Sequence, residues 1–238
     1  MMIHGVMLSL RGRFTPSRVV ASRVACLGKE LFSEWGLINQ QKSRADVFLK
    51  SLGHEIKPRY SEIMPFIRRK DILPLIAQQC GMPWDKIGIP GRLFIMDSFS
   101  ELTDQEFVHK KEGWSFCANY SDIDHNAEFK ETFDAKGLLP VSQFEKTYKD
   151  FFEWLFSKNS NITILYLHFP TALDERPQFR ERARCLHSAL QMWEGKGIVN
   201  VSITDNMVSH AGGDAFPYHY SDATYNEFRE LLLRLGVV

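Results

Sequence analysis

The sequence predicts an α/β protein, a three-layer α/β/α sandwich built on a mainly parallel sheet. Two observations predict this class: short apolar runs typical of strands buried on both faces, and long helical patterns between the later runs. Strands that alternate with helices form parallel sheets through right-handed crossovers. The 238 residues are predicted to form a single domain, 1–238, in which residues 1–20 are a lead-in segment.

Four apolar runs are the predicted strands. They are rich in Ile, Val, Leu and Phe and do not alternate cleanly with polar residues, as expected where helices cover both faces of a sheet. The runs are "RVACL" (23–27), "LFIM" (93–96), "ITILYLHF" (162–169) and "IVNVSI" (198–203).

Three helices are predicted in the second half of the chain. The first follows Ser142, which forms a capping-box pattern with Glu145 ahead of a stripe of aromatic residues. The second has its apolar stripe over residues 179–193. The third begins at Ser221 or Asp222, because both residue types are good N-caps.

Two further segments lie between the predicted strands. Residues 54–90 read as a mostly helical insertion, apolar at helical spacing but interrupted by Pro65 and Pro74. Residues 103–137 are rich in Asp, Glu, Lys and Asn, and we expect them to be irregular.

The composition is that of a globular protein with no excess charge. Hydrophobic residues make up 44% and charged residues 24%, and 29 Lys and Arg balance 29 Asp and Glu. A net charge of zero means that the chain has no excess of positive charge to attract nucleic acid. No apolar run approaches the roughly 20 residues of a membrane span, so none is expected.

Cysteine usage and the N-terminus bear on location. The four cysteines have neither a CxxC pair nor zinc-type spacing, which favours buried free thiols in a reducing, cytoplasmic compartment: Cys26, Cys80, Cys117 and Cys185. Residues 1–29 contain arginines but no acidic residue, a composition typical of organelle transit peptides. The strand-like "RVACLG" favours a lead-in segment instead.

Polar residues that follow the predicted strands are the candidate site, because the carboxyl ends of parallel strands meet at one rim. His219 follows the last strand and is the natural general base, since imidazole titrates near neutral pH. Asp214 or Asp222 could orient it. The alternative is a hydrogen-bonded packing residue between Tyr218 and Tyr220.

Asp97 directly follows the second strand, where an uncompensated carboxylate is costly. It has either a functional role or a hydrogen bond to loop backbone. If the chain turns helical after Asp97, the carboxylates of Asp97 and Glu101 share a face of that helix. Two carboxylates without a nearby histidine are a weak signal for a metal site, and no metal is predicted. Alternatively, Ser100 or Thr103 caps a short helix there.

Arg44 precedes a short helix in "QKSRADVFLKSLG". Its guanidinium either binds a carboxylate or phosphate of a ligand, or is solvated or paired with an internal Asp or Glu. The sequence contains no P-loop, GxGxxG, GxSxG or HExxH motif, which excludes the common nucleotide-binding, α/β-hydrolase and zinc-peptidase classes.

The order of several motifs carries a family resemblance. A strand ending in Gly precedes "SRADVFLKSLG", then a strand into "MDSFSEL", a strand into Pro, and "AFPYHYSDATY" before the last helix. Over residues 20–235 this resembles the SGNH-hydrolase superfamily. It looks closest to a bacterial branch that is linked to capsule and surface-polysaccharide biosynthesis and includes acetyltransferases. The resemblance implies an SGNH- or flavodoxin-like fold.

The resemblance also implies roles. His219 holds the position of the superfamily's catalytic histidine, but Phe216 stands where its partner Asp is usual. Glu30 occupies the place of the nucleophilic serine, and Ser33 could replace it only if the loop differs; Asn119 is the candidate oxyanion donor. His219, Asp97, Glu30 and Ser33 are therefore the predicted catalytic residues. The predicted substrate-binding residues are Glu101, Ser98, Arg44, Tyr218, Asp222 and Asn119.

Three functions follow as hypotheses. The first is an acyltransferase or esterase acting on carbohydrate acyl groups, in which His219 deprotonates a sugar hydroxyl; it needs no cofactor, and acyl-CoA could be the donor substrate. The second is a non-catalytic glycan-binding or polysaccharide-assembly protein, favoured by Glu30. The third is a metal-dependent phosphoesterase using Asp97 and Glu101. Each takes a small-molecule or carbohydrate substrate, and the oligomeric state stays open.

Overall fold

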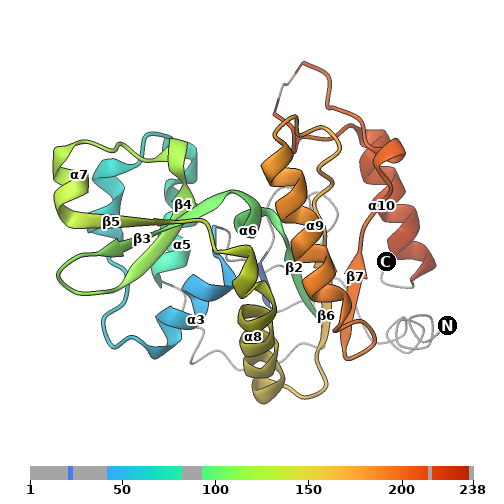
Figure 1. The fold of residues 1–238 in the computed structure, drawn as a ribbon, viewed down its shortest axis with the longest axis horizontal. Coiled ribbons are helices and arrows are strands. Elements are labelled where there is room, and N and C mark those ends of the chain that lie inside the picture. The colour runs from blue at the N-terminus through green and yellow to red at the C-terminus, as the bar shows by residue number, and fades with distance from the viewer. Residues whose placement is uncertain (1–20, 24–41, 82–92, 214–215, 236–238) are drawn as a thin grey trace. The chain divides into compact units, whose positions relative to one another are not determined.

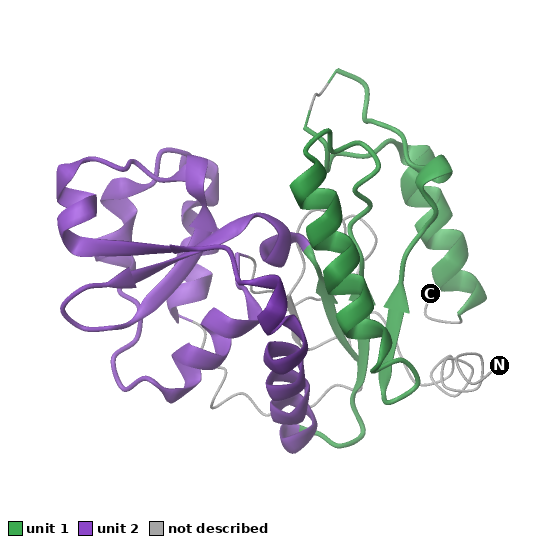
Figure 2. Ribbon diagram, in the orientation of Figure 1, with its two compact units in different colours: residues 1–38, 89–98, 159–238 green, residues 39–88, 99–158 purple. Residues whose placement is uncertain are grey.

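The computed structural model describes residues 21–23, 42–81, 93–213 and 216–235. The chain divides into two compact units, coloured separately in Figure 2. Unit 1 comprises residues 1–38, 89–98 and 159–238, and unit 2 comprises residues 39–88 and 99–158. Two compact units can belong to one folding domain, so the single domain over 1–238 stays a prediction.

Unit 1 contains a four-stranded sheet in the order β1-β2-β6-β7, in which every neighbouring pair is parallel. β2 and β6 are buried along their whole length, which explains their continuous apolar sequences. The α/β class and the parallel sheet are confirmed, whereas the three-layer sandwich stays a prediction. The strands are β1 (Ala21–Arg23), β2 (Leu93–Asp97), β6 (Thr163–Leu167) and β7 (Ile198–Val201).

The first predicted strand, 23–27, shares only Arg23 with β1, and its other residues lie outside the described part of the chain. The strands predicted at 93–96, 162–169 and 198–203 are confirmed, each to within two residues at either end.

Two long helices belong to unit 1, as predicted. α9 (Pro177–Gln191) begins with a proline, which suits a first turn whose N–H groups need no partner. Figure 1 shows α9 lying across one face of the parallel sheet, and Asn200 of β7 donates to the carbonyl of Leu190. α10 (Asp222–Arg234) has Ser221 as its N-cap, and a short 3₁₀ helix, η6 (Asp205–Met207), precedes it.

Unit 2 contains a three-stranded antiparallel sheet in the order β4-β3-β5. Its strands are β3 (Asp104–His109), β4 (Ser115–Asn119) and β5 (Phe133–Gly137), with α7 (Ala127–Thr132) before β5. The prediction that residues 103–137 are irregular is therefore wrong. The strands are only five or six residues long, and one face carries Phe107, Phe116 and Phe133 in an apolar core.

Short helices surround this sheet. The helical insertion predicted over residues 54–90 is confirmed over 60–81, whereas 54–59 contain no helix and 82–90 lie outside the described residues. Pro65 and Pro74 fall in first turns, where proline is tolerated. The elements are α3 (Ala45–Gly53), α4 (Tyr60–Ile63), η2 (Met64–Phe66), η3 (Lys70–Ile72), α5 (Leu73–Gly81), α6 (Phe99–Thr103), η4 (Tyr120–Asp122), η5 (Val141–Gln143) and α8 (Phe144–Lys158). The helix predicted after Ser142 is α8, and Ser142 itself lies in η5.

Two further predictions concern composition. The described cysteines, Cys80, Cys117 and Cys185, are free thiols, of which Cys117 is fully buried, while Cys26 lies outside the described residues. None of the helices that the structure describes has the length and apolar character needed to cross a membrane.

Candidate active site

The carboxyl ends of β2, β6 and β7 lie at one edge of the parallel sheet, as the sequence predicted for these strands. Ser98, directly after β2, joins two of them: its backbone N–H donates to the carbonyl of Leu167 at 3.1 Å, and its Oγ accepts from the N–H of Phe169 at 2.9 Å. Ser98 and Asp97 are both buried. The polar residues after these strands therefore form a common rim.

His219 lies on this rim between two buried tyrosines. The Tyr218 hydroxyl donates to Oδ2 of Asp174 at 2.6 Å, and the Tyr220 hydroxyl donates to the carbonyl of Pro170 at 2.8 Å. Tyr218 and Tyr220 are 0% and 3% exposed, whereas His219 is exposed. Both tyrosines are thus buried and hydrogen-bonded, and the histidine side chain between them reaches solvent; the predicted part of Tyr218 in substrate binding stays a prediction.

The backbone of His219 is held on both sides. Its N–H donates to the carbonyl of Phe216, and its carbonyl accepts from the N–H of Ala211, each at 3.1 Å. The imidazole lies against the Phe216 ring, with 4.7 Å between centroids. Phe216 is 39% exposed and lines a hollow of about 830 Å³ together with Pro217, Asp174, Arg176 and His210.

Asp174 links the loop that follows β6 to the loop that precedes α10. Nε and Nη2 of Arg176 donate to its two carboxylate oxygens at 2.8 and 2.7 Å, beside the bond from Tyr218. Burial opposes ionisation of Asp174, but the hydrogen bonds from Arg176 and Tyr218 outweigh it and lower the carboxyl pKa. Burial and the adjacent carboxylate raise the pKa of Tyr218. At neutral pH the tyrosine is therefore the donor and the aspartate the charged acceptor.

Arg44 belongs to unit 2 and is fully occupied by internal partners. Its Nε and Nη2 donate to the carboxylate of Asp46 at 2.9 and 2.5 Å, and Nη1 donates to the carbonyls of Asp104 and Gly137. The side chain is 1% exposed. The internal ion pair, one of the two predicted alternatives, is the one that the structure shows.

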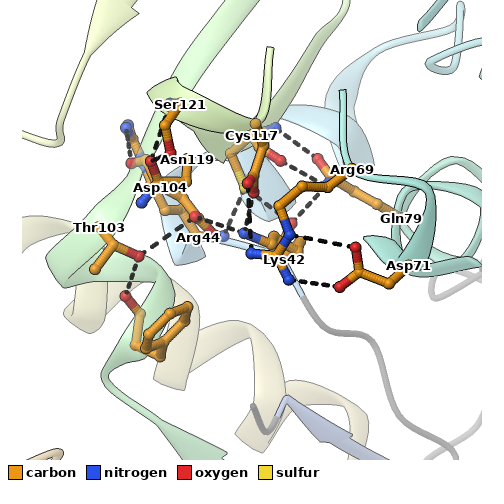
Figure 3. A network of polar contacts seen from close by, with 12 residues as sticks. Lys42, Arg44, Arg69, Asp71, Gln79, Thr103, Asp104, Cys117, Asn119 and Ser121 are labelled. Atoms are coloured by element: carbon orange, nitrogen blue, oxygen red, sulfur yellow. Dashed lines mark hydrogen bonds and ion pairs between the residues drawn. The ribbon is translucent and has the colours of Figure 1, made fainter. Parts of the chain in front are cut away.

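Arg44 is part of a buried charge network (Figure 3). Nζ of Lys42 lies 2.9 Å from Asp122 and 3.4 Å from Asp104. Burial alone lowers the pKa of Lys42, but these two carboxylates outweigh it and raise the pKa. Cys117 joins the network by donating its thiol to the carbonyl of Lys42. The cations of this network are thus paired with carboxylates of unit 2.

The other predicted residues in unit 2 have local backbone roles. Oε1 of Glu101 accepts from the N–H of Ala45 at the start of α3, at 2.9 Å. Asn119 is the N-cap of η4, where its Oδ1 accepts from the N–H and the hydroxyl of Ser121. The predicted part of Glu101 and Asn119 in substrate binding stays a prediction.

Asp97 and Glu101 do not share a helix face, so that expectation is wrong. Asp97 is the last residue of β2, and α6 begins only at Phe99. The described residues hold no group of three or more His, Cys, Asp or Glu side chains that could bind a metal ion. Asp222, the remaining predicted residue, is exposed in the first turn of α10.

Glu30 and Ser33 lie outside the described residues, as does Asp214. Their predicted roles, as occupants of the nucleophile position and as orienting carboxylate, stay predictions.

Sequence reasoning missed a second hollow, of about 180 Å³, on the same rim. It is lined by His168, directly after β6, and by four residues of α9, of which three are polar: Arg180, Arg184 and His187. Two signals could have pointed to it. His168 follows a strand whose carboxyl end faces the rim, and the three polar α9 residues recur at helical spacing beside the apolar stripe.

Comparisons with known proteins complete this description. No family model and no curated protein matches the chain. Among solved structures, a GDSL-like lipase from Bacteroides thetaiotaomicron VPI-5482 aligns over 99% of this chain and 98% of its own, with 12% sequence identity and a TM-score of 0.45. The resemblance to a surface-polysaccharide branch stays a prediction.

Proposed function

We propose that this chain is an SGNH-like enzyme that transfers or hydrolyses acyl groups on a carbohydrate, with His219 as its general base. The observation that carries the proposal is the anchoring of His219. Two buried tyrosines and two backbone hydrogen bonds hold the residue, and yet its imidazole is exposed at the carboxyl edge of a parallel sheet. A general base must be fixed in place and still reach its substrate.

The adjacent hollow supports a carbohydrate substrate. Phe216 presents an exposed aromatic ring beside the imidazole, and aromatic side chains offer an apolar face to a ligand. Asp174 and Arg176 supply charged hydrogen-bonding groups to the same lining. An aromatic face with polar groups around it suits a sugar ring, which has an apolar face and a rim of hydroxyls.

The chemical step uses His219 as a proton carrier. The imidazole accepts the proton of a sugar hydroxyl, and the hydroxyl oxygen attacks the carbonyl carbon of the acyl donor. The bond from that carbon to the donor's leaving group breaks, and the leaving group takes the proton from the imidazolium. With acyl-CoA as donor the products are the acylated sugar and free CoA. In the hydrolytic direction, water replaces the sugar hydroxyl as the nucleophile.

The free cysteine thiols fit a location in a reducing compartment such as the cytoplasm.

One observation favours a second function. The resemblance to the SGNH superfamily puts Glu30 at the position of the nucleophile, and a carboxylate there cannot act as a serine does. The alternative is a non-catalytic glycan-binding protein of the same fold.

The test compares the wild-type chain with His219→Gln on short-chain p-nitrophenyl esters, O-acetylated sugars and acyl-CoA with sugar acceptors. Loss of a general base is expected to lower kcat by about 10²- to 10⁴-fold. The thermal midpoint should not change, because the tyrosines on either side provide the packing. His54→Gln, at an exposed histidine of unit 2, is the matched control and should retain full activity.

Turnover by His219→Gln at the wild-type rate contradicts the role of His219. Sugar binding without turnover in the wild-type chain replaces the proposal with the glycan-binding alternative.

A further inference from the structure

The hollow of about 180 Å³ lies where β2, β6 and β7 end, and all of its lining belongs to unit 1. Besides His168 and the residues of α9, it contains hydroxyl groups from the loops that follow the strands. These are Ser98, Thr171 and Ser202. Among the described residues of the lining, Asp205 is the one carboxylate.

A chain of hydrogen bonds fixes the tautomer of His168. Nδ2 of Asn200 lies 2.7 Å from Oε2 of Glu194 and 3.2 Å from the carbonyl of Leu190, and both of these atoms can only accept. The other amide atom of Asn200, Oδ1, must therefore accept from Nε2 of His168, 3.0 Å away. With its proton on Nε2, the neutral imidazole has Nδ1 as an acceptor.

The surroundings keep this imidazole neutral. His168 is buried and stacks on His187 with 4.3 Å between ring centroids. Burial lowers the pKa of His168 to about 3, and the neighbouring His187 adds to this effect. Within the described part of the chain, Nδ1 makes no hydrogen bond, so its acceptor site is available to a ligand.

Two arginines of α9 supply positive charge to the same hollow. Arg180 and Arg184 are one helical turn apart and therefore share a face of the helix with His187. Arg184 pairs with the exposed carboxylate of Glu181 at 2.9 Å. No carboxylate of the described residues lies within ion-pair distance of Arg180, in contrast to the enclosed Arg44.

We propose that this hollow binds a small hydroxylated oxyanion, the phosphate or carboxylate of a sugar. Arg180 and Arg184 bind the oxyanion, because guanidinium groups match the geometry of phosphate and carboxylate oxygens. Nδ1 of His168 accepts a hydrogen bond from a ligand hydroxyl, and the Thr171 and Ser202 hydroxyls complete the site. The site is distinct from His219 and does not depend on acyl chemistry.

The experiment measures binding to the full chain by isothermal titration calorimetry with four probes: inorganic phosphate, glucose 6-phosphate, glucuronate and glucose. The phosphate and carboxylate arms distinguish the two sources of the anion. We expect at least one of the two sugar anions to bind, at least tenfold more tightly than glucose. The Arg180→Ala/Arg184→Ala double variant should lose at least tenfold in affinity for that anion, whereas Arg234→Ala, at an exposed arginine of α10, should not.

Three results overturn the proposal: neither sugar anion binds, the double variant binds as tightly as the wild-type chain, or glucose binds as tightly as its charged counterparts. Inorganic phosphate binding as tightly as glucose 6-phosphate overturns the role of the ligand hydroxyls. Because His168→Phe could fail to fold, ¹⁵N-histidine NMR of the wild-type chain tests the tautomer directly. A proton on Nδ1, or ring signals of His168 that do not change when the bound sugar anion is added, removes His168 from the site.

Discussion

Arg44 in unit 2 has the opposite surroundings to Arg180 and Arg184 in unit 1. In unit 2, every donor group of Arg44 faces a carboxylate or a carbonyl of the same unit, and Lys42 is enclosed by two carboxylates. In unit 1, Arg180 and Arg184 line a hollow on the sheet rim. Buried charges must be paired where they lie, whereas a binding site keeps charge available for a ligand. Burial among internal partners therefore indicates a structural role for Arg44 and Lys42, whereas a position on the lining of a rim hollow favours a binding role for Arg180 and Arg184.

The largest expected effect on stability comes from removing the buried ion pair of Arg44 with Asp46. Arg44→Met removes both guanidinium hydrogen bonds from the buried carboxylate of Asp46, which keeps the half-exposed Lys50 at 3.9 Å, and the free energy of unfolding should fall by about 3–5 kcal/mol. Arg180→Ala should change it by less than about 0.5 kcal/mol. Urea denaturation at pH 7 measures both.

A second variant tests the cause. Adding Asp46→Leu to Arg44→Met removes the buried carboxylate and should restore much of the lost stability. If Arg44→Met unfolds at the same urea concentration as Arg180→Ala, the ion pair does not stabilise unit 2.

The next largest effect concerns His168, the buried histidine of unit 1. Its pKa is about 3 in the folded protein and near 6.5 when unfolded, so only the unfolded chain takes up a proton between these values. The contribution of the neutral imidazole to the free energy of unfolding has its full value above pH 6.5. Below that pH it falls by up to about 1.4 kcal/mol per pH unit. The facing groups are His187, whose pKa burial also lowers, and Glu194 beyond Asn200.

His168→Gln should remove this dependence. The difference in unfolding free energy between pH 7 and pH 5, measured by urea denaturation, should shrink by roughly 2 kcal/mol relative to the wild-type chain. An unchanged pH dependence means that His168 takes up a proton in the folded state, contrary to its buried position.

The smallest effect is local to the last helix. Oγ of Ser221 accepts from the N–H of Thr224 at 3.3 Å, so Ser221→Ala should cost about 1 kcal/mol. Ser142→Ala is the control, because Ser142 lies in η5 and its hydroxyl makes no hydrogen bond to a described residue. Thermal unfolding compares the two variants. Equal losses would show that Ser221 is no more a cap than Ser142.

The parts of the fold that could be predicted are those whose signal is local. β2, β6 and β7 are continuous apolar runs, and the stripes of α8, α9 and α10 recur at helical spacing. The antiparallel sheet of unit 2 could not be predicted in this way. Its polar residues are buried by distant partners, as where Lys50 of α3 lies 2.6 Å from Glu106 of β3, and no local pattern reports such a pairing.

The residues of the candidate site also differ in whether the local sequence indicates their position. The rim position of His219 followed from strand order and from its place before the last helix. His168 lies within an apolar run and reads as part of the strand, while its partner Asn200 is 32 residues further on. The ion-pair partner of Arg44, Asp46, is only two residues away, but the carbonyls of Asp104 and Gly137 that complete its burial come from far along the chain.

The interleaving of the two units has a consequence for biosynthesis. β2 emerges from the ribosome long before its neighbour β6, because all of residues 99–158 lie between them. Unit 2 is complete once residue 158 has emerged, whereas the sheet of unit 1 must wait for β7. During that interval β2 is an apolar strand with an open edge, the kind of segment on which nascent chains misassociate.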